Sequence, residues 1–397
     1  MPQSVVELLR DLVAIPSVNP MGRDISGPEF FEGRMSDYLE RFFVELGVPF
    51  ERHEIVPGRA NLIARFESSN APITLLLDAH QDTVPIEGMT IPPFEPTIAD
   101  GRVYGRGSCD VKGGMAAMLW AFQRLVRERP AGAANVVMSC TCDEEATSLG
   151  VHALTSLWTA PCGRSKLLVQ APDAAIIAEP TLLHIVVAHR GATRFRVRTA
   201  GRACHSSNPT LGINAIYRMG RLVQALEEYA ARLPSQVVPH PLCGSATLSV
   251  GRITGGTSVN VVPDDCVIEI DRRVIPGEES AAVIQDVHRF LSSRLDFDFE
   301  FEPPFVQSCA LNNDANGWVA ESLLEQIIPV AGPREAIGVA YGTHASRTAA
   351  KGVPSVVFGP GSIDQAHTKD EWIAIDELEK AAEIYFRMCV RPPRVPS

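Results

Sequence analysis

The chain has 397 residues, of which 45% are hydrophobic and 21% charged, and its formal net charge is −11. This composition is typical of soluble globular proteins, the length predicts two or three domains, and the negative charge argues against nucleic acid or an anionic membrane as partner. No apolar run is long enough for a transmembrane helix, and no signal peptide is recognisable. Nine scattered cysteines favour reduced thiols, so we expect a cytoplasmic protein.

The first half of the chain alternates between helix and strand patterns. A helix is expected from Ser4, which has capping-box spacing to Glu7, and a second over 30–46, closed by Gly47. A hairpin turns on Asp100-Gly101. Buried strands are expected at 73–79, 135–141 and 174–178, with helices at 113–126 and 148–158 between them. This rhythm predicts an α/β sandwich with a mixed, largely parallel sheet.

The pattern changes near residue 185. Strands with period-two alternation and amphipathic helices follow in the order strand, helix, strand, strand, helix, strand, which predicts a compact α+β (ferredoxin-like) module. Strand PSVVFG and a helix at 375–389 then return the chain to the first domain. We therefore expect catalytic domain segments at 1–184 and 303–397, interrupted by an inserted domain at 185–302.

Acidic residues and histidines follow the predicted strands of the first domain. They are His80 and Asp82 in LLLDAHQDTVP, Asp110 in GRGSCDVKGG, Glu144 and Glu145 in DEEATS, Glu179 in AEPT, and His367 in GPGSIDQAHTKDE. Each alone could be an ordinary solvated side chain. Parallel strand ends converge on one edge of a sheet, however, and two histidines with three carboxylates suffice for two neighbouring zinc ions. The glycine-rich segment around Asp110 fits no phosphate-loop spacing, which disfavours a nucleotide-binding enzyme.

From about residue 75 to the C-terminus the chain resembles one family of dinuclear zinc hydrolases. That family includes acetylornithine deacetylase, succinyl-diaminopimelate desuccinylase, aminoacylase and glutamate carboxypeptidase. The matching segments occur in the same order: DAHQDTVP, DGRVYGRGSCDVKGG, CDEEAT, AEPT, GRACHSSNPTLGINAI, GGTSVNVVPD and FGPGSIDQAHTKDE. By position, the resemblance implies that one zinc is bound by His80 and Glu179, the other by Glu145 and His367, and that Asp110 bridges them.

The resemblance implies further roles. Asp82 would orient His80, and Glu144 would be the general base. In the inserted domain, which usually forms a homodimer in this family, His205 would reach the partner's active site and polarise the scissile carbonyl. Asn260 and Arg273 would contact substrate, and a guanidinium suits a carboxylate because it offers a planar two-point grip.

The expected reaction is removal of an acyl group from the nitrogen of an amino-acid-like small molecule, with cobalt or manganese as alternatives to zinc. A carboxypeptidase or dipeptidase of the same family is the first alternative, and a catalytically silent binding protein on this scaffold is the second. His344 departs from the acidic residue or serine of many relatives, which leaves side-chain specificity open.

Overall fold

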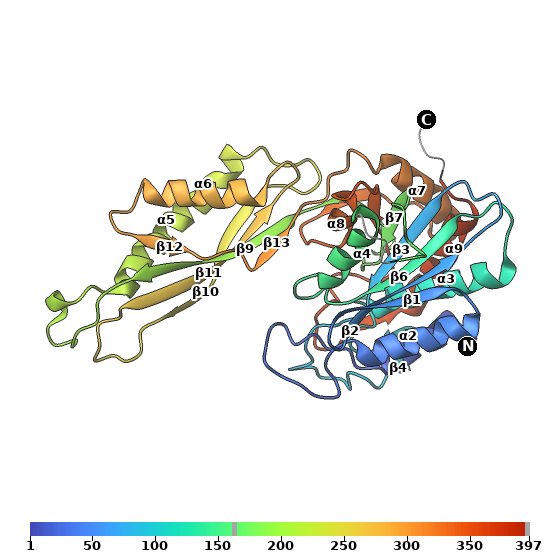
Figure 1. The fold of residues 1–397 in the computed structure, drawn as a ribbon, viewed down its shortest axis with the longest axis horizontal. Helices are drawn as coiled ribbons and strands as arrows, with labels where there is room; N and C mark the ends of the chain where they lie inside the picture. Colours follow the sequence, from blue (N-terminus) through green and yellow to red (C-terminus); the bar gives the residue numbers. More distant parts are fainter. Residues whose placement is uncertain (161–164, 394–397) are drawn as a thin grey trace. The chain divides into compact units, whose positions relative to one another are not determined.

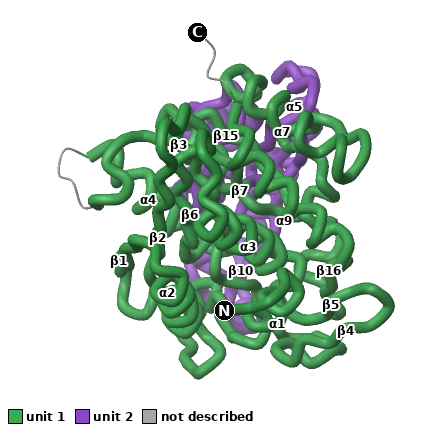
Figure 2. The backbone as a smooth tube through the Cα atoms, turned by 90° about the vertical axis from the view of Figure 1, so that its right-hand side faces the viewer, with its two compact units in different colours: residues 1–187, 313–337, 343–397 green, residues 188–312, 338–342 purple. Residues whose placement is uncertain are grey.

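The structure is a computed structural model that describes residues 1–160 and 165–393. The chain divides into two compact units, coloured separately in Figure 2. Unit 1 comprises residues 1–187, 313–337 and 343–397, and unit 2 comprises residues 188–312 and 338–342. Among the described residues, no helix combines the length and apolarity needed to cross a bilayer.

Unit 1 is built on an eight-stranded sheet with the order β1-β2-β6-β3-β7-β15-β8-β14. The four central strands β6, β3, β7 and β15 run parallel. Strand β2 pairs antiparallel with both β1 and β6, and β8 pairs antiparallel with β15. The bounds are β1 Phe50–Val56, β2 Arg59–Phe66, β3 Thr74–His80, β6 Asn135–Thr141, β7 Ala174–Ile177, β8 Ile185–His189, β14 Ala336–Val339 and β15 Ser355–Val357. A small sheet adds β4 Thr97–Ala99, β5 Arg102–Tyr104 and β16 Trp372–Ala374.

Helices cover both faces of the large sheet (Figure 1). One face packs against α1 Val5–Val13, α2 Gly33–Leu46, α3 Lys112–Glu128, α7 Gly317–Ala331 and α9 Ile375–Val390, whose apolar residues join alternate strand residues in one buried core. The other face carries α4 Leu149–Thr159 and α8 Ala345–Ala349. Because both faces are covered, β3 is buried at every residue from Leu75 to His80.

Local signals in the sequence account for several element ends. The Ser4 side chain caps α1 by accepting the amide N–H of Glu7, and Gly47 ends α2 at a φ of 69°, a left-handed conformation that suits glycine. Asp100 and Gly101 both have positive φ in the β4–β5 turn. The two helices and the hairpin predicted here are confirmed, as is the mixed sheet with parallel central strands.

Unit 2 has an antiparallel sheet of order β10-β11-β9-β12, with β13 also paired to β9. Its elements are β9 Gly191–Ala200, α5 Ala215–Gln236, β10 Thr247–Gly255, β11 Asp265–Val274, α6 Ser280–Ser292, β12 Phe299–Phe301 and β13 Val306–Ser308. A 3-10 turn at Pro209–Leu211 lies between β9 and α5. Helices α5 and α6 pack on one face (Figure 1). This is the ferredoxin-like order of strands and helices.

The other face of the unit 2 sheet carries rows of ion pairs. Arg194 pairs with Asp271 and Arg196 with Glu269, each at 3.0 Å, across the β9–β11 register. Strand β9 therefore alternates buried apolar and outward charged residues, as its period-two pattern predicted.

Candidate metal centre

The predicted ligand residues follow the four adjacent parallel strands of unit 1. His80 is the last residue of β3, Glu145 follows β6, Glu179 follows β7, and His367 lies between β15 and β16. Asp110 lies in the loop that joins β5 to α3. Because these strands are parallel neighbours, their carboxyl ends meet at one edge of the sheet, where α/β proteins place their active sites.

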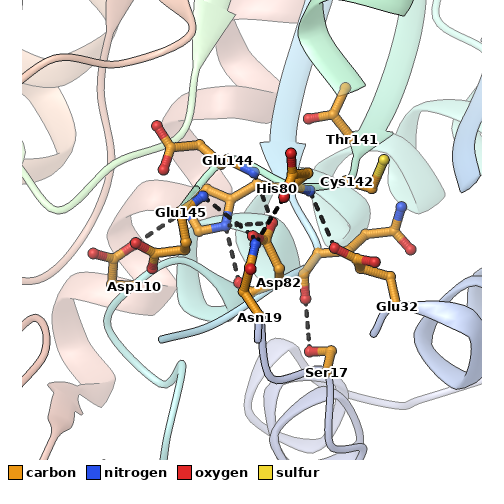
Figure 3. Close-up of polar contacts among 12 residues, drawn as sticks. Ser17, Asn19, Glu32, His80, Asp82, Asp110, Thr141, Cys142, Glu144 and Glu145 are labelled. Carbon is orange, nitrogen blue, oxygen red and sulfur yellow. Dashed lines mark hydrogen bonds and ion pairs between the residues drawn. The ribbon is translucent and has the colours of Figure 1, made fainter. Parts of the chain in front are cut away.

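Asp110 lies between the two histidines. His80 Nε2 is 3.2 Å from Asp110 Oδ1, and His367 Nε2 is 3.3 Å from Asp110 Oδ2. His367 Nε2 is also 3.3 Å from Glu145 Oε1. The structure thus brings together His80, Asp110, Glu145 and His367, three of which are labelled in Figure 3.

Several carboxylates are crowded into this site. Burial, and then the negative charge of Asp110, raises the pKa of Glu145 to about 8 and the pKa of Glu179 well above its usual range. Burial also raises the pKa of Glu144. Burial opposes ionisation of Asp110 too, but His367 and His80 outweigh it and hold its pKa below the usual range.

The histidines show the opposite shift. Hydrogen bonds to Asp110, and next to Glu145, raise the pKa of His367 to about 10. Burial alone would lower the pKa of His80, but Asp110 and Asp82 outweigh it and raise that pKa above its usual range. Asp110, whose pKa is lowered, therefore favours the protonated form of both histidines.

This set of side chains fits a pair of divalent cations. The ligand atoms of His80, Asp110 and Glu145 lie within 4.8 Å of one another. Asp110 presents each oxygen to a different histidine, which is the arrangement required of a carboxylate shared between two ions. Imidazole and carboxylate are ligands of zinc, and two positive ions would relieve the repulsion among the buried acids.

Asp82 supports both His80 and the turn after β6. His80 Nδ1 lies 3.0 Å from the main-chain oxygen of Asp82 and 3.6 Å from its carboxylate, so the carbonyl is the nearer partner. The Asp82 carboxylate instead accepts the backbone N–H groups of Glu144 and Glu145 at 3.0 and 3.1 Å. Asp82 therefore fixes the positions of the two consecutive glutamates as well as the imidazole.

A buried polar network behind this turn was not found from the sequence. Asn19 donates to Asp82 at 2.8 Å and to Asp143 at 3.0 Å, and Arg59 donates to Asp143 at 2.6 Å and to Glu32. Figure 3 shows Asn19 and Glu32 beside Asp82. Asn19, Glu32 and Arg59 precede the matching motifs, and single polar residues there carry no recognisable spacing.

His344 is buried and held by a second carboxylate. Its Nδ1 is 3.0 Å from Asp78 Oδ2, and Thr141 also donates to Asp78. The side chain of His344 is only 2% exposed. His344 is therefore anchored beneath the sheet edge by the aspartate that begins the motif DAHQDTVP.

The predicted substrate residues all lie in unit 2. The backbone N–H of Ser206 donates to the carbonyl of Asn260 at 3.0 Å, and His205 forms an isolated antiparallel β-bridge with Val261. These backbone contacts bring His205 and Asn260 close together. Arg273 projects from β11 with its side chain 30% exposed and pairs with Asp271.

The neighbouring arginine of β11 is differently placed. Arg272 is only 1% exposed and pairs with Glu278 at 2.6 Å. Of the two adjacent arginines, Arg273 is therefore the accessible one.

Comparison with known proteins places the chain among its relatives. Residues 76–391 match the model of peptidase family M20/M25/M40. Acetylornithine deacetylase of Vibrio campbellii is 30% identical over 420 residues, covering 98% of each chain. The enzyme of the same name from Photorhabdus laumondii is 32% identical over 381 residues, covering 93% of this chain and 92% of its own.

Solved structures share the fold. A metallo-carboxypeptidase of the M20 family from Sulfolobus solfataricus has a TM-score of 0.77 at 20% identity, covering 98% of this chain and 99% of its own. A Staphylococcus aureus tripeptidase has a TM-score of 0.76 at 21% identity, covering 98% and 97%. The chain belongs to peptidase family M20/M25/M40 and is a metal-dependent hydrolase of amide bonds.

Proposed function

We propose that this chain is a two-zinc deacylase that releases the amino group of an N-acylated, carboxylate-bearing amino acid. The observation that carries the proposal is Asp110, whose two oxygens face two histidines at the edge where four parallel strands end. Relatives named acetylornithine deacetylase, similar along nearly the whole chain, support an N-acyl amino acid as substrate. The scattered cysteines support a cytoplasmic location.

In this proposal one cation is held by His80 and Glu179, and the other is held by Glu145 and His367. Asp110 binds both cations. The bound cations would polarise the amide carbonyl and make water a better nucleophile at neutral pH. Glu144 accepts a proton from the attacking water and delivers it to the leaving amine. Its burial supports this role, because a raised pKa brings a carboxyl group nearer to the range in which it can both accept and donate.

We further propose that unit 2 forms a homodimer and supplies His205 to the partner's site. Strand β10 is an edge of its sheet in the described part of the chain. Large apolar side chains are exposed near it and near His205: Leu211 is 63% exposed, Tyr217 74%, Ile253 59% and Val259 101%. A second copy covering this surface would remove them from water. His205 would then stabilise the developing oxyanion, Asn260 would contact the substrate, and Arg273 would bind its carboxylate.

The substrate class can be tested with purified protein loaded with zinc, cobalt or manganese. N-acetyl and N-succinyl amino acids and dipeptides are compared by kcat/KM. We expect the N-acyl amino acids to be hydrolysed best. A preference for dipeptides would replace this proposal with a peptidase, and loss of all hydrolysis would favour the silent binding protein.

Glu144→Gln should lower kcat by about 10²- to 10⁴-fold, the contribution of a general base, because the amide cannot accept the proton. The bound metal, measured by elemental analysis, should remain nearly unchanged. Glu67→Gln, at a side chain 72% exposed, serves as the matched control. Full activity of Glu144→Gln would contradict the mechanism.

Metal binding should release protons and should tighten as the pH rises. Cations bind the deprotonated forms of Glu145, whose pKa is about 8, and His367, whose pKa is about 10, and both hold protons at pH 7 in the metal-free protein. Calorimetric titration at pH 7 in buffers of different ionisation enthalpy counts these protons. The wild type should release more protons than His367→Ala; equal release would exclude His367 as a ligand.

Mixing two inactive variants tests whether His205 crosses between subunits. Glu144→Ala and His205→Ala chains, dissociated and reassociated together, should recover about a quarter of wild-type activity. Half of randomly formed dimers are mixed, and one of the two sites in each is complete. Recovery should be absent when either variant is treated alone, and no recovery in verified mixed dimers would overturn the shared site.

A further inference from the structure

A buried ion pair lies next to the metal centre without belonging to its ligands. Arg106 Nη1 is 2.7 Å from Glu371 Oε2, and the two side chains are 3% and 0% exposed. Arg106 precedes Asp110 by four residues, and Glu371 follows His367 by four. Burying two opposite charges costs free energy through desolvation, and this cost can cancel the attraction between them. A gain in folding stability therefore does not account for the pair.

Both oxygens of Glu371 are used by the loop that carries Asp110. Oε2 accepts from Arg106 and from the backbone N–H of Gly107 at 2.9 Å. Oε1 accepts the backbone N–H groups of Cys109 and Asp110, each at 2.9 Å. The loop therefore curls around one carboxylate, which accepts three of the loop's backbone N–H groups.

The loop also requires a glycine at its bend. Gly107 has a φ of +83°, and a Cβ there would lie 2.7 Å from Thr83 Cγ2. The close approach to the segment after His80 thus depends on glycine.

Arg106 connects the same loop to two further segments. Its Nη2 donates to the carbonyl of Pro85 at 3.1 Å and to the carbonyl of Thr368 at 3.3 Å. Pro85 lies five residues beyond His80, and Thr368 is next to His367. One guanidinium thus links the chain segments that carry both histidine ligands and the bridging aspartate, and its planar fork is suited to several acceptors at once.

We propose that Arg106 and Glu371 are positioning residues that set the relative places of His80, Asp110 and His367 before any cation binds. The inference deepens the proposed function, because it concerns how the two-cation site is assembled. Ligands held in place by their supporting hydrogen bonds bind metal more tightly, since less ordering is needed on binding.

Two substitutions separate this role from general stabilisation. Glu371→Gln keeps the side-chain size but replaces one acceptor with an NH₂ donor, and both oxygens face N–H donors, so neither orientation of the amide satisfies the loop. Arg106→Lys keeps the charge but loses the fork that reaches Glu371, Pro85 and Thr368 together.

The chain contains a matched control pair in unit 2. Arg272 and Glu278 form a similar ion pair, with side chains 1% and 14% exposed, and Glu278 likewise accepts a backbone N–H, from Ile275 at 3.0 Å. Glu278→Gln and Arg272→Lys therefore remove comparable interactions far from any ligand in sequence.

The first measurement uses the metal-free, full-length protein. Hydrogen exchange should be slow at the amides of Gly107, Cys109 and Asp110 in the wild type and faster in both Glu371→Gln and Arg106→Lys. The control variants should leave these three amides unchanged. This readout requires neither metal nor hydrolysis, so it tests the positioning role of Arg106 and Glu371 even if the proposed function fails.

The second measurement is affinity for Co²⁺, by competition with a chelator, together with the visible spectrum of the bound ion. Glu371→Gln should weaken binding by about 10- to 100-fold, the usual effect of losing a partner that orients ligands. Arg106→Lys should weaken binding in the same direction, and the controls should match the wild type.

Wild-type Co²⁺ affinity and wild-type exchange in Glu371→Gln would overturn the inference. If Glu371→Gln does not fold, Arg106→Lys decides by the same two readouts. A wild type that binds no Co²⁺ would instead refute the proposed two-cation site. The hydrogen-exchange result alone would then decide whether Arg106 and Glu371 hold the loop in place.

Discussion

The crowding of Asp110, Glu144, Glu145 and Glu179 at one sheet edge, largely out of water, is the physical constraint on which the rest of unit 1 depends. Such a group is unfavourable unless positive charge and N–H donors surround it. His80 and His367 supply positive charge by facing the bridging aspartate. The backbone N–H groups of Glu144 and Asp110 are in turn held by two further buried carboxylates, Asp82 and Glu371. The loops after the strands are shaped around carboxylates, and the strands themselves are buried apolar supports.

Much of this arrangement could be predicted because short stretches of neighbouring residues indicate the strands, their ends and the turns. Apolar runs that end in His80, Glu145 or Glu179 indicate strands with functional ends, and an alternating β9 indicates a sheet with one open face. The Gly47 cap and the Asp100-Gly101 turn mark where elements stop. These signals depend on neighbours in sequence, so a single chain is sufficient to read them.

The remainder depends on residues that meet only after folding. Asn19 and Arg59 reach Asp143 across 124 and 84 residues, and His344 meets Asp78 across 266. A single asparagine or arginine forms no sequence motif, so its distant partner cannot be inferred from the sequence. The outer strands β1 and β2, which pair antiparallel and bring Arg59 to the turn after β6, belong to the same class of long-range information.

The position of β15 has a consequence for how the protein is made. This strand lies between β7 and β8, pairing parallel with the first and antiparallel with the second, yet it is synthesised after all of residues 188–312. On the ribosome, the core residues of unit 2 emerge as one continuous stretch of chain. The central sheet of unit 1 instead lacks the strand between β7 and β8 until residue 357 leaves the tunnel. His367 emerges later still, so it is the last of the predicted ligand residues to become available to the folding chain.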